Sequence, residues 1–120
     1  MRFHHIGVLT NSIDTAAHGA PIVDDKVWGI RSALQCIGDL QVEMIGPIEM
    51  GSWIRQALTR GIIVHHLGLE VEDAEQALQR LRNSGWFIVH QPRLTALWKA
   101  KSAFVMSPDR IPVELVEIPR

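Results

Sequence analysis

The sequence has little of several features that would point to a particular class of protein. One cysteine in 120 residues excludes a disulfide within the chain. With 12 basic and 13 acidic residues the net charge is −1, which gives no electrostatic reason to bind nucleic acid or an anionic membrane. No apolar run approaches the roughly 20 residues that cross a bilayer, and the N-terminus has no signal-peptide layout. We therefore expect a cytoplasmic protein with neither nucleic acid nor membrane as a partner.

The single cysteine, Cys36, lies in the apolar stretch 33–37 (ALQCI). That setting predicts a buried thiol that packs in the core rather than a nucleophile. Low-complexity stretches are absent as well, and 47% of the residues are hydrophobic. The length suits one ordinary domain with a single core.

A near-copy within the chain is its most informative feature. Residues 3–8 (FHHIGV) return as residues 64–69 (VHHLGL), and residues 42–45 (VEMI) return as residues 113–116 (VELV). We therefore predict one domain over 1–120, built from two related modules that share a core. Module one covers 1–47, a connector covers 48–61, and module two covers 62–120.

Each module is predicted to read β-α-β-β-β, which is an α+β fold. The first helix is expected to be short, because residues 18–21 (HGAP) end it and proline disfavours helical geometry in the residue before it. Its counterpart over Glu72–Asn83 has apolar residues at helical spacing. The connector is too apolar for a flexible linker, and its residues 53–58 indicate a helical turn that packs. The expected strands and hairpins lie at 3–10, 22–23, 28–37 with 40–45, 86–89, and 103–106 with 112–117.

Alternation along a strand allows only one histidine of each pair to face a common site. His4 and His65 share their faces with apolar residues that a helix should cover, whereas His5 and His66 share theirs with glycines. The same parity places the two repeated glutamates on the side of the sheet away from the helices. Four residues are left on that hollow side: His5, Glu43, His66 and Glu114.

Two explanations fit these four side chains. A strand histidine and glutamate can simply hydrogen-bond within a core. The matched doubling favours a divalent metal shared by two imidazoles and two carboxylates, since buried glutamates need a partner to offset their desolvation. Ni²⁺, Co²⁺, Zn²⁺, Mn²⁺ and Fe²⁺ all suit such a donor set.

These motifs together resemble the vicinal oxygen chelate superfamily, which contains glyoxalase I, methylmalonyl-CoA epimerase, extradiol dioxygenases and bleomycin-resistance proteins. The resemblance covers nearly the whole chain and is nearest to small glyoxalase-like and epimerase-like members. It implies two βαβββ modules forming a curved mixed sheet around a central cavity. Carried over position by position, it implies the same metal ligands: His5, Glu43, His66 and Glu114.

The resemblance implies a metal-dependent isomerase, epimerase or lyase that stabilises an enolate or enediolate of a small carbonyl or thioester substrate. Glu43 or Glu114 would then detach and accept a proton. The chain departs from the family at two positions. Leu9 stands where glyoxalase I uses an arginine for glutathione, and Ser32 stands near the catalytic glutamate of epimerases.

Other residues could contribute to the same chemistry. Glu70 lies on the hollow side by parity and could act as a base, although an ion pair with Arg31 or Lys101 would also explain it. Lys101 could hold a substrate carboxylate or phosphate, or be a solvated surface residue. Trp98 could line a pocket, or belong to the core or a dimer interface. With Ser32, these two are the candidate substrate contacts.

Two further readings of the whole chain stay open. A drug-sequestering module of the same fold would bind a hydrophobic ligand without catalysis, and a folding scaffold would retain only a vestigial site. Exposed sheet edges and the short first helix favour a homodimer, as this family often forms.

Overall fold

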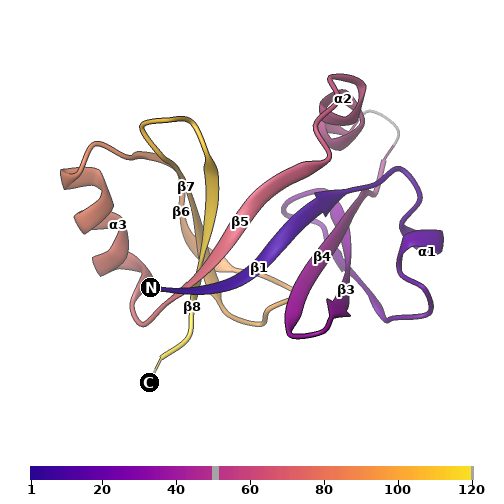
Figure 1. Ribbon diagram of the computed structural model, residues 1–120, viewed down its shortest axis with the longest axis horizontal. Helices are drawn as coiled ribbons and strands as arrows, with labels where there is room; N and C mark the ends of the chain where they lie inside the picture. Colours follow the sequence, from indigo (N-terminus) through magenta and orange to yellow (C-terminus); the bar gives the residue numbers. More distant parts are fainter. Residues whose placement is uncertain (50–51, 120) are drawn as a thin grey trace. The chain divides into compact units, whose positions relative to one another are not determined.

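The computed structural model describes residues 1–49 and 52–119 (Figure 1). Met50 and Gly51 of the predicted connector, and Arg120 at the end of the second predicted module, lie outside the described residues. The chain divides into two compact units, one of residues 5–65 and one of residues 1–4 with 66–120. The single domain with module boundaries at 47 and 62 stays a prediction.

The unit of residues 5–65 contains a four-stranded arrangement in the order β2-β3-β4-β1. Strand β1 is parallel to β4, and the other neighbours are antiparallel. Its elements are β1 (Arg2–Leu9, which begins in the other unit), α1 (Ile13–Ala16), β2 (Ile22–Asp25), β3 (Ile30–Ile37), β4 (Leu40–Pro47) and α2 (Trp53–Thr59).

The second unit repeats this plan in the order β5-β8-β7-β6, with β5 parallel to β8 and the other pairs antiparallel. Both halves therefore read β-α-β-β-β, and the predicted α+β fold class is confirmed. The elements of this second unit are β5 (Val64–Val71, which begins in the other unit), α3 (Ala74–Asn83), β6 (Phe87–Leu94), β7 (Lys101–Met106) and β8 (Pro112–Glu117).

Helix α1 is as short as the sequence predicts, with four residues. The chain turns immediately after it, where His18 and Gly19 adopt positive φ angles of 48° and 83°. Gly46 of β4 lies directly beneath the helix, because a Cβ atom added there would be 2.8 Å from the Cβ of Ile13. Only a residue without a side chain allows α1 to lie this close to β4.

Helix α3 is longer, with ten residues, and both of its ends are well defined. The Asp73 carboxylate accepts a hydrogen bond from Gln76 N at 3.0 Å, and Glu117 Oε2 accepts one from Ala74 N at 2.9 Å. Two arginines, Arg80 and Arg82, occupy the last turn, where positive charge is favoured by the helix dipole. The two carboxylates at its start thus serve as helix caps.

Helices α1 and α3 cover the strand faces that alternation predicts. In the second half α3 packs on Val113 and Leu115, which flank Glu114, and on Leu69 and Val71 of β5. In the first half Met44, next to Glu43, packs with the cluster of Ile13, Ala17 and Ala33. The two repeated glutamates therefore point to the opposite sides of their sheets.

Helix α2, the predicted helical turn of the connector, does pack. Ile54 is fully buried and forms a cluster with Leu9 and Ile45. These two strand residues share the faces of His5 and Glu43, so α2 closes the apolar end of the face that bears this pair. No helix in the described part of the chain has the length and apolar composition that a bilayer crossing needs.

The prediction of a buried Cys36 is wrong, because the thiol is exposed. Cys36 lies near the end of β3, where Ile37 and Gly38 of the following turn are exposed as well. The apolar neighbours in the sequence belong to the strand's more central part, and the core ends before the strand does.

Candidate functional site

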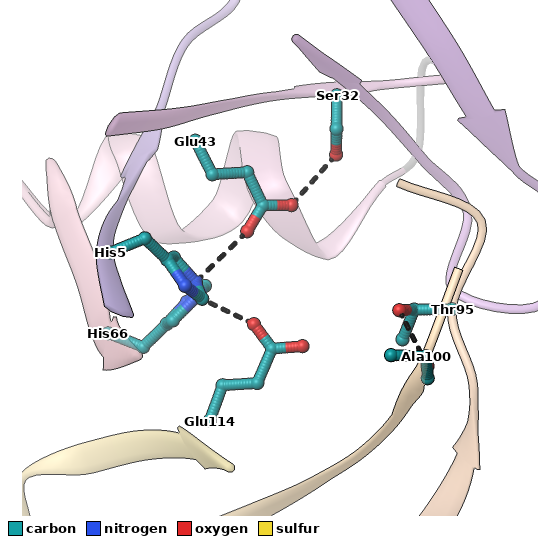
Figure 2. A network of polar contacts seen from close by, with 7 residues as sticks. All are labelled: His5, Ser32, Glu43, His66, Thr95, Ala100 and Glu114. Carbon is teal, nitrogen blue, oxygen red and sulfur yellow. Dashed lines mark hydrogen bonds and ion pairs between the residues drawn. The ribbon is translucent and has the colours of Figure 1, made fainter. Parts of the chain in front are cut away.

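The first half holds a buried histidine–glutamate pair. His5 and Glu43 are 0% and 4% exposed, and His5 Nε2 lies 3.4 Å from Glu43 Oε1. Strand β1 presents the histidine and strand β4 presents the glutamate. Figure 2 shows the two side chains pointing toward each other.

The second half holds an equivalent pair. His66 and Glu114 are 3% and 4% exposed, and His66 Nε2 lies 3.3 Å from Glu114 Oε1 (Figure 2). Strand β5 presents the histidine and strand β8 presents the glutamate. The ring of Phe104 packs edge-on against His66, with 4.9 Å between the ring centroids, and so limits how the imidazole can turn.

The strand register explains why both pairs have the same geometry. Glu43 lies opposite Gly7 in the parallel β1–β4 pair, and Glu114 lies opposite Gly68 in the parallel β5–β8 pair. Each glycine follows the histidine by two residues and shares its face. Because glycine has no side chain, the carboxylate can extend over it toward the imidazole.

Both pairs fit the requirements of a metal ligand set. Imidazole nitrogen and carboxylate oxygen suit divalent transition metals, and burial makes an unshared carboxylate charge costly. The nitrogen–oxygen distances of 3.4 and 3.3 Å exceed the roughly 2.7–2.9 Å of a charge-assisted hydrogen bond. Neither pair is therefore a tight hydrogen bond, and each offers one nitrogen and one oxygen that could hold an ion.

Ser32 lies beside the first pair. Its side chain is buried, and its hydroxyl donates a hydrogen bond to Glu43 Oε2 at 3.0 Å (Figure 2). The hydroxyl thus holds the outer oxygen of the carboxylate while the inner oxygen faces His5. In the sequence Ser32 stands near the position of the epimerases' catalytic glutamate and is a candidate substrate contact, and no local pattern there indicates the bond to Glu43.

Ser102 is the residue that sequence reasoning missed. It is 0% exposed and occupies on β7 the position that Ser32 occupies on β3. The signal was available, since residues 31–34 (RSAL) return as residues 101–104 (KSAF).

His90 is a second residue to which the sequence analysis assigns no role. Its ring packs on Phe104 at 5.2 Å between centroids, on the side of β7 that also carries Ser102. Burial lowers the pKa of His90 below its usual value of 6.5, and nearby Arg93 acts in the same direction. The Gln91 carbonyl and the Glu114 charge oppose this shift of the pKa without reversing it.

Glu70 is half-buried on β5 and forms an ion pair with Arg2, whose Nε lies 3.6 Å from Glu70 Oε1. The carboxylate borders a pocket of about 340 Å³ that is also lined by Arg80 of α3. The expected partners are engaged elsewhere, Arg31 with Asp24 and Asp14 and Lys101 with Glu75. A catalytic role for Glu70 stays a prediction.

The two other predicted substrate contacts are Lys101 and Trp98. Lys101 is exposed and pairs with Glu75 of α3 at 3.8 Å, on the helix-covered side of β7. Trp98 packs edge-on against His4, with 4.6 Å between ring centroids. The turn that carries Trp98 is closed by the hydrogen bond from Thr95 Oγ1 to the Ala100 carbonyl (Figure 2).

Two βαβββ halves, each with a histidine on its first strand and a glutamate on its last, define the class of protein that has the vicinal oxygen chelate fold. The sequence pattern of the glyoxalase/bleomycin resistance protein/dioxygenase superfamily matches residues 4–104. The chain belongs to this superfamily, as the sequence analysis predicts.

Solved structures share the fold over nearly the whole chain. Methylmalonyl-CoA epimerase from Mycobacterium tuberculosis is 24% identical with a TM-score of 0.80, covering 99% of this chain and 88% of that one. A variant of the Streptomyces coelicolor methylmalonyl-CoA epimerase, in complex with 2-nitronate-propionyl-CoA, is 20% identical with a TM-score of 0.80, covering 99% of both chains.

A hypothetical protein from Bacillus halodurans is 21% identical with a TM-score of 0.78, covering 99% of this chain and 95% of that one. Among proteins of curated function, no sequence matches the chain. At these identities the similarity shows a common fold, and the activity has to be argued from the side chains.

Proposed function

We propose that the protein is a metal-dependent enzyme of the glyoxalase and epimerase type, with His5, Glu43, His66 and Glu114 as the ligands of one divalent cation. The observation that carries the proposal is the buried His–Glu pair in each half, set by the same strand register and nearly the same distance. Membership of the superfamily supports joining the two pairs in one site.

The donor set supports a catalytic rather than a purely structural ion. Two imidazoles with two carboxylates suit Ni²⁺, Co²⁺, Zn²⁺, Mn²⁺ or Fe²⁺, and leave coordination positions for a substrate. When bound, such an ion supplies Lewis-acid stabilisation of the oxyanion that develops as a carbonyl substrate loses its α-proton.

The chain's own residues would move the proton. A carboxylate next to the substrate carbon can accept the α-proton. Return of the proton to the neighbouring carbon of an enediolate gives isomerisation, and delivery of a proton to the opposite face of the same carbon by a second carboxylate gives epimerisation. Glu43 and Glu114 are the first candidates because their carboxylates lie at the ligand positions. Glu70 is the third, on the same face of β5 as His66.

The proposed substrate is a small carbonyl compound or thioester. Support comes from structural relatives, since one solved epimerase is in complex with 2-nitronate-propionyl-CoA. Ser32 and Trp98 are the candidate contacts, with Lys101 for a distant anionic group. Glutathione is not the proposed substrate, because Leu9 stands where an arginine would supply the positive charge that binds it. Lyase chemistry and a location in the cytoplasm stay predictions.

Metal analysis tests the proposal most directly. Protein purified from medium supplemented with divalent metals should contain about one equivalent of metal per site, measured by mass spectrometry of the digested protein. His66→Ala should lose this metal, because it removes one ligand. His65→Ala is the matched control. The His65 side chain lies on the other face of β5 from His66, so this variant should keep the metal.

The same comparison applies to the first half, where His5→Ala should lose the metal and His4→Ala should keep it. Equal metal content in all four variants, or no metal in the unchanged protein, would contradict the proposal. Thermal stabilisation by apolar ligands without any by Ni²⁺, Co²⁺, Zn²⁺ or Mn²⁺ would instead favour the drug-sequestering module.

Assembly as a homodimer is also proposed. Strand β6 is at the end of the strand order in its unit, and its residues Phe87, Val89 and Leu94 are exposed. Apolar side chains on an edge strand favour pairing with another chain. Light scattering coupled to size-exclusion chromatography measures the mass, and a monomer at all concentrations would contradict this part of the proposal.

A further inference from the structure

Two serines occupy equivalent places beside the two glutamates. Ser32 lies opposite Ile45 in the antiparallel β3–β4 pair, and Ser102 lies opposite Val116 in the antiparallel β7–β8 pair. The glutamate of each half lies two residues before the residue opposite the serine. Each serine is therefore a diagonal neighbour of its glutamate on the same face of the sheet. The relation between serine and glutamate is the same in both halves.

The first half shows what this diagonal allows. Ser32 Oγ reaches Glu43 Oε2 at 3.0 Å while Glu43 Oε1 stays 3.4 Å from His5 Nε2 (Figure 2). The hydroxyl restricts rotation of the carboxylate and keeps its inner oxygen at the ligand position. Such supporting hydrogen bonds orient ligands and raise metal affinity.

The second half has the same serine without the bond. Ser102 is 0% exposed, and its hydroxyl has no hydrogen-bond partner among the residues that the structure describes. A buried hydroxyl without a partner costs free energy, so an alanine would serve better if packing were its only task. A polar group kept there points to a partner in another state of the protein.

We propose that Ser102 is a positioning residue for Glu114, whose carboxylate accepts a hydrogen bond from the Ser102 hydroxyl when the metal binds. This inference rests on the proposed metal site. Two ligand atoms that each lie about 2.0–2.2 Å from one ion are roughly 3.0–3.5 Å apart. The separation of 3.3 Å between His66 Nε2 and Glu114 Oε1 therefore suits a shared ion and leaves Glu114 Oε2 to accept from the Ser102 hydroxyl. Ser102 then holds Glu114 as Ser32 holds Glu43.

The two serines should respond differently to removal of the hydroxyl. Ser32 donates a hydrogen bond to Glu43, so Ser32→Ala should lower the unfolding temperature of the metal-free protein and also weaken Co²⁺ binding. Ser102→Ala should leave the metal-free unfolding temperature unchanged or raise it, yet weaken Co²⁺ binding about tenfold. Calorimetric titration with Co²⁺ and thermal unfolding after chelation measure the two quantities.

Ser102→Thr keeps the hydroxyl and should bind Co²⁺ within about twofold of the unchanged protein, since its hydroxyl can donate the same hydrogen bond. The visible spectrum of the Co²⁺ protein, which reports ligand geometry, should change in Ser102→Ala and be restored in Ser102→Thr. If the extra methyl group prevents folding, the contrast between Ser102→Ala and Ser32→Ala still decides.

Two results would overturn the inference. Unchanged Co²⁺ affinity in Ser102→Ala would remove the link between Ser102 and the metal. A metal-free unfolding temperature lowered as much as in Ser32→Ala would show a purely structural role. Absence of Co²⁺ binding in the unchanged protein is a different outcome, because it defeats the proposed metal site itself.

Discussion

The two βαβββ halves differ most in the helix after their first strand. Helix α1 has four residues and α3 has ten, yet the His–Glu distances beside them are 3.4 and 3.3 Å. The glutamates keep the same register against a glycine in both halves. Strand pairing, rather than the length of the covering helix, therefore sets the geometry of each pair.

The contact between helix and last strand also differs. Three residues after its glutamate, the first half has Gly46 and the second half has Glu117. Gly46 lies against Ile13, the first residue of α1, whereas Glu117 accepts a hydrogen bond from Ala74, the first residue of α3. The same position thus attaches one helix by close approach and the other by a polar cap.

Breaking the close approach in the first half should have the largest effect. In Gly46→Ala the new methyl group would lie 2.8 Å from Ile13 Cβ, so α1 must shift. We expect a loss of about 1–3 kcal/mol in the free energy of unfolding, the usual cost of overpacking. Urea denaturation measures it, and an unchanged midpoint would show that α1 yields without cost.

Removing the caps should give a smaller and asymmetric effect. Asp73→Ala deletes the hydrogen bond to Gln76 N and should cost about 1 kcal/mol of stability. Ser12→Ala is the matched control, because the Ser12 side chain makes no capping bond to α1, and it should cost a few tenths at most. Equal losses in the two variants would contradict this difference between the helices.

The smallest effect concerns His90, which has no equivalent in the first half. Because burial lowers its pKa in the folded state, the unfolded chain takes up a proton first as the pH falls. Its contribution to stability is therefore complete above about pH 6.5 and is lost as the pH falls through the lowered pKa. His90→Gln removes this titration and should flatten the dependence of the free energy of unfolding on pH between about pH 7.5 and 5, by a slope of at most about one proton. Thermal unfolding across this pH range measures it. An identical profile would exclude His90 as a source.

Much of the fold could be predicted because the repeat shows which segments correspond. Alternation predicts that His5 and His66 lie on the face of the glutamates, and the contacts of 3.4 and 3.3 Å with Glu43 and Glu114 agree. The short α1 followed from residues 18–21. The sequence predicts the start of β6 but not its length. Pro92 argues against a strand there, because proline is tolerated in a strand only at the edge of a sheet.

Other features depend on contacts that no local pattern states. Cys36 has apolar neighbours in the sequence, but its exposure depends on where the core ends under the hairpin. The ion pair of Glu70 with Arg2 joins the start of the chain to β5, and neither residue's neighbours indicate it. The ion pair of Lys101 with Glu75 of α3 is not indicated locally either, because the packing of α3 decides which side of β7 meets the helix.

The exposed thiol of Cys36 has a practical consequence. As the chain's only cysteine it offers one reactive position per molecule, so a maleimide dye or nitroxide attaches at a defined point without any engineered substitution. In a homodimer, two nitroxides would give a single distance by pulsed electron resonance, and a monomer would give none. The natural sequence thus carries its own reporter for assembly.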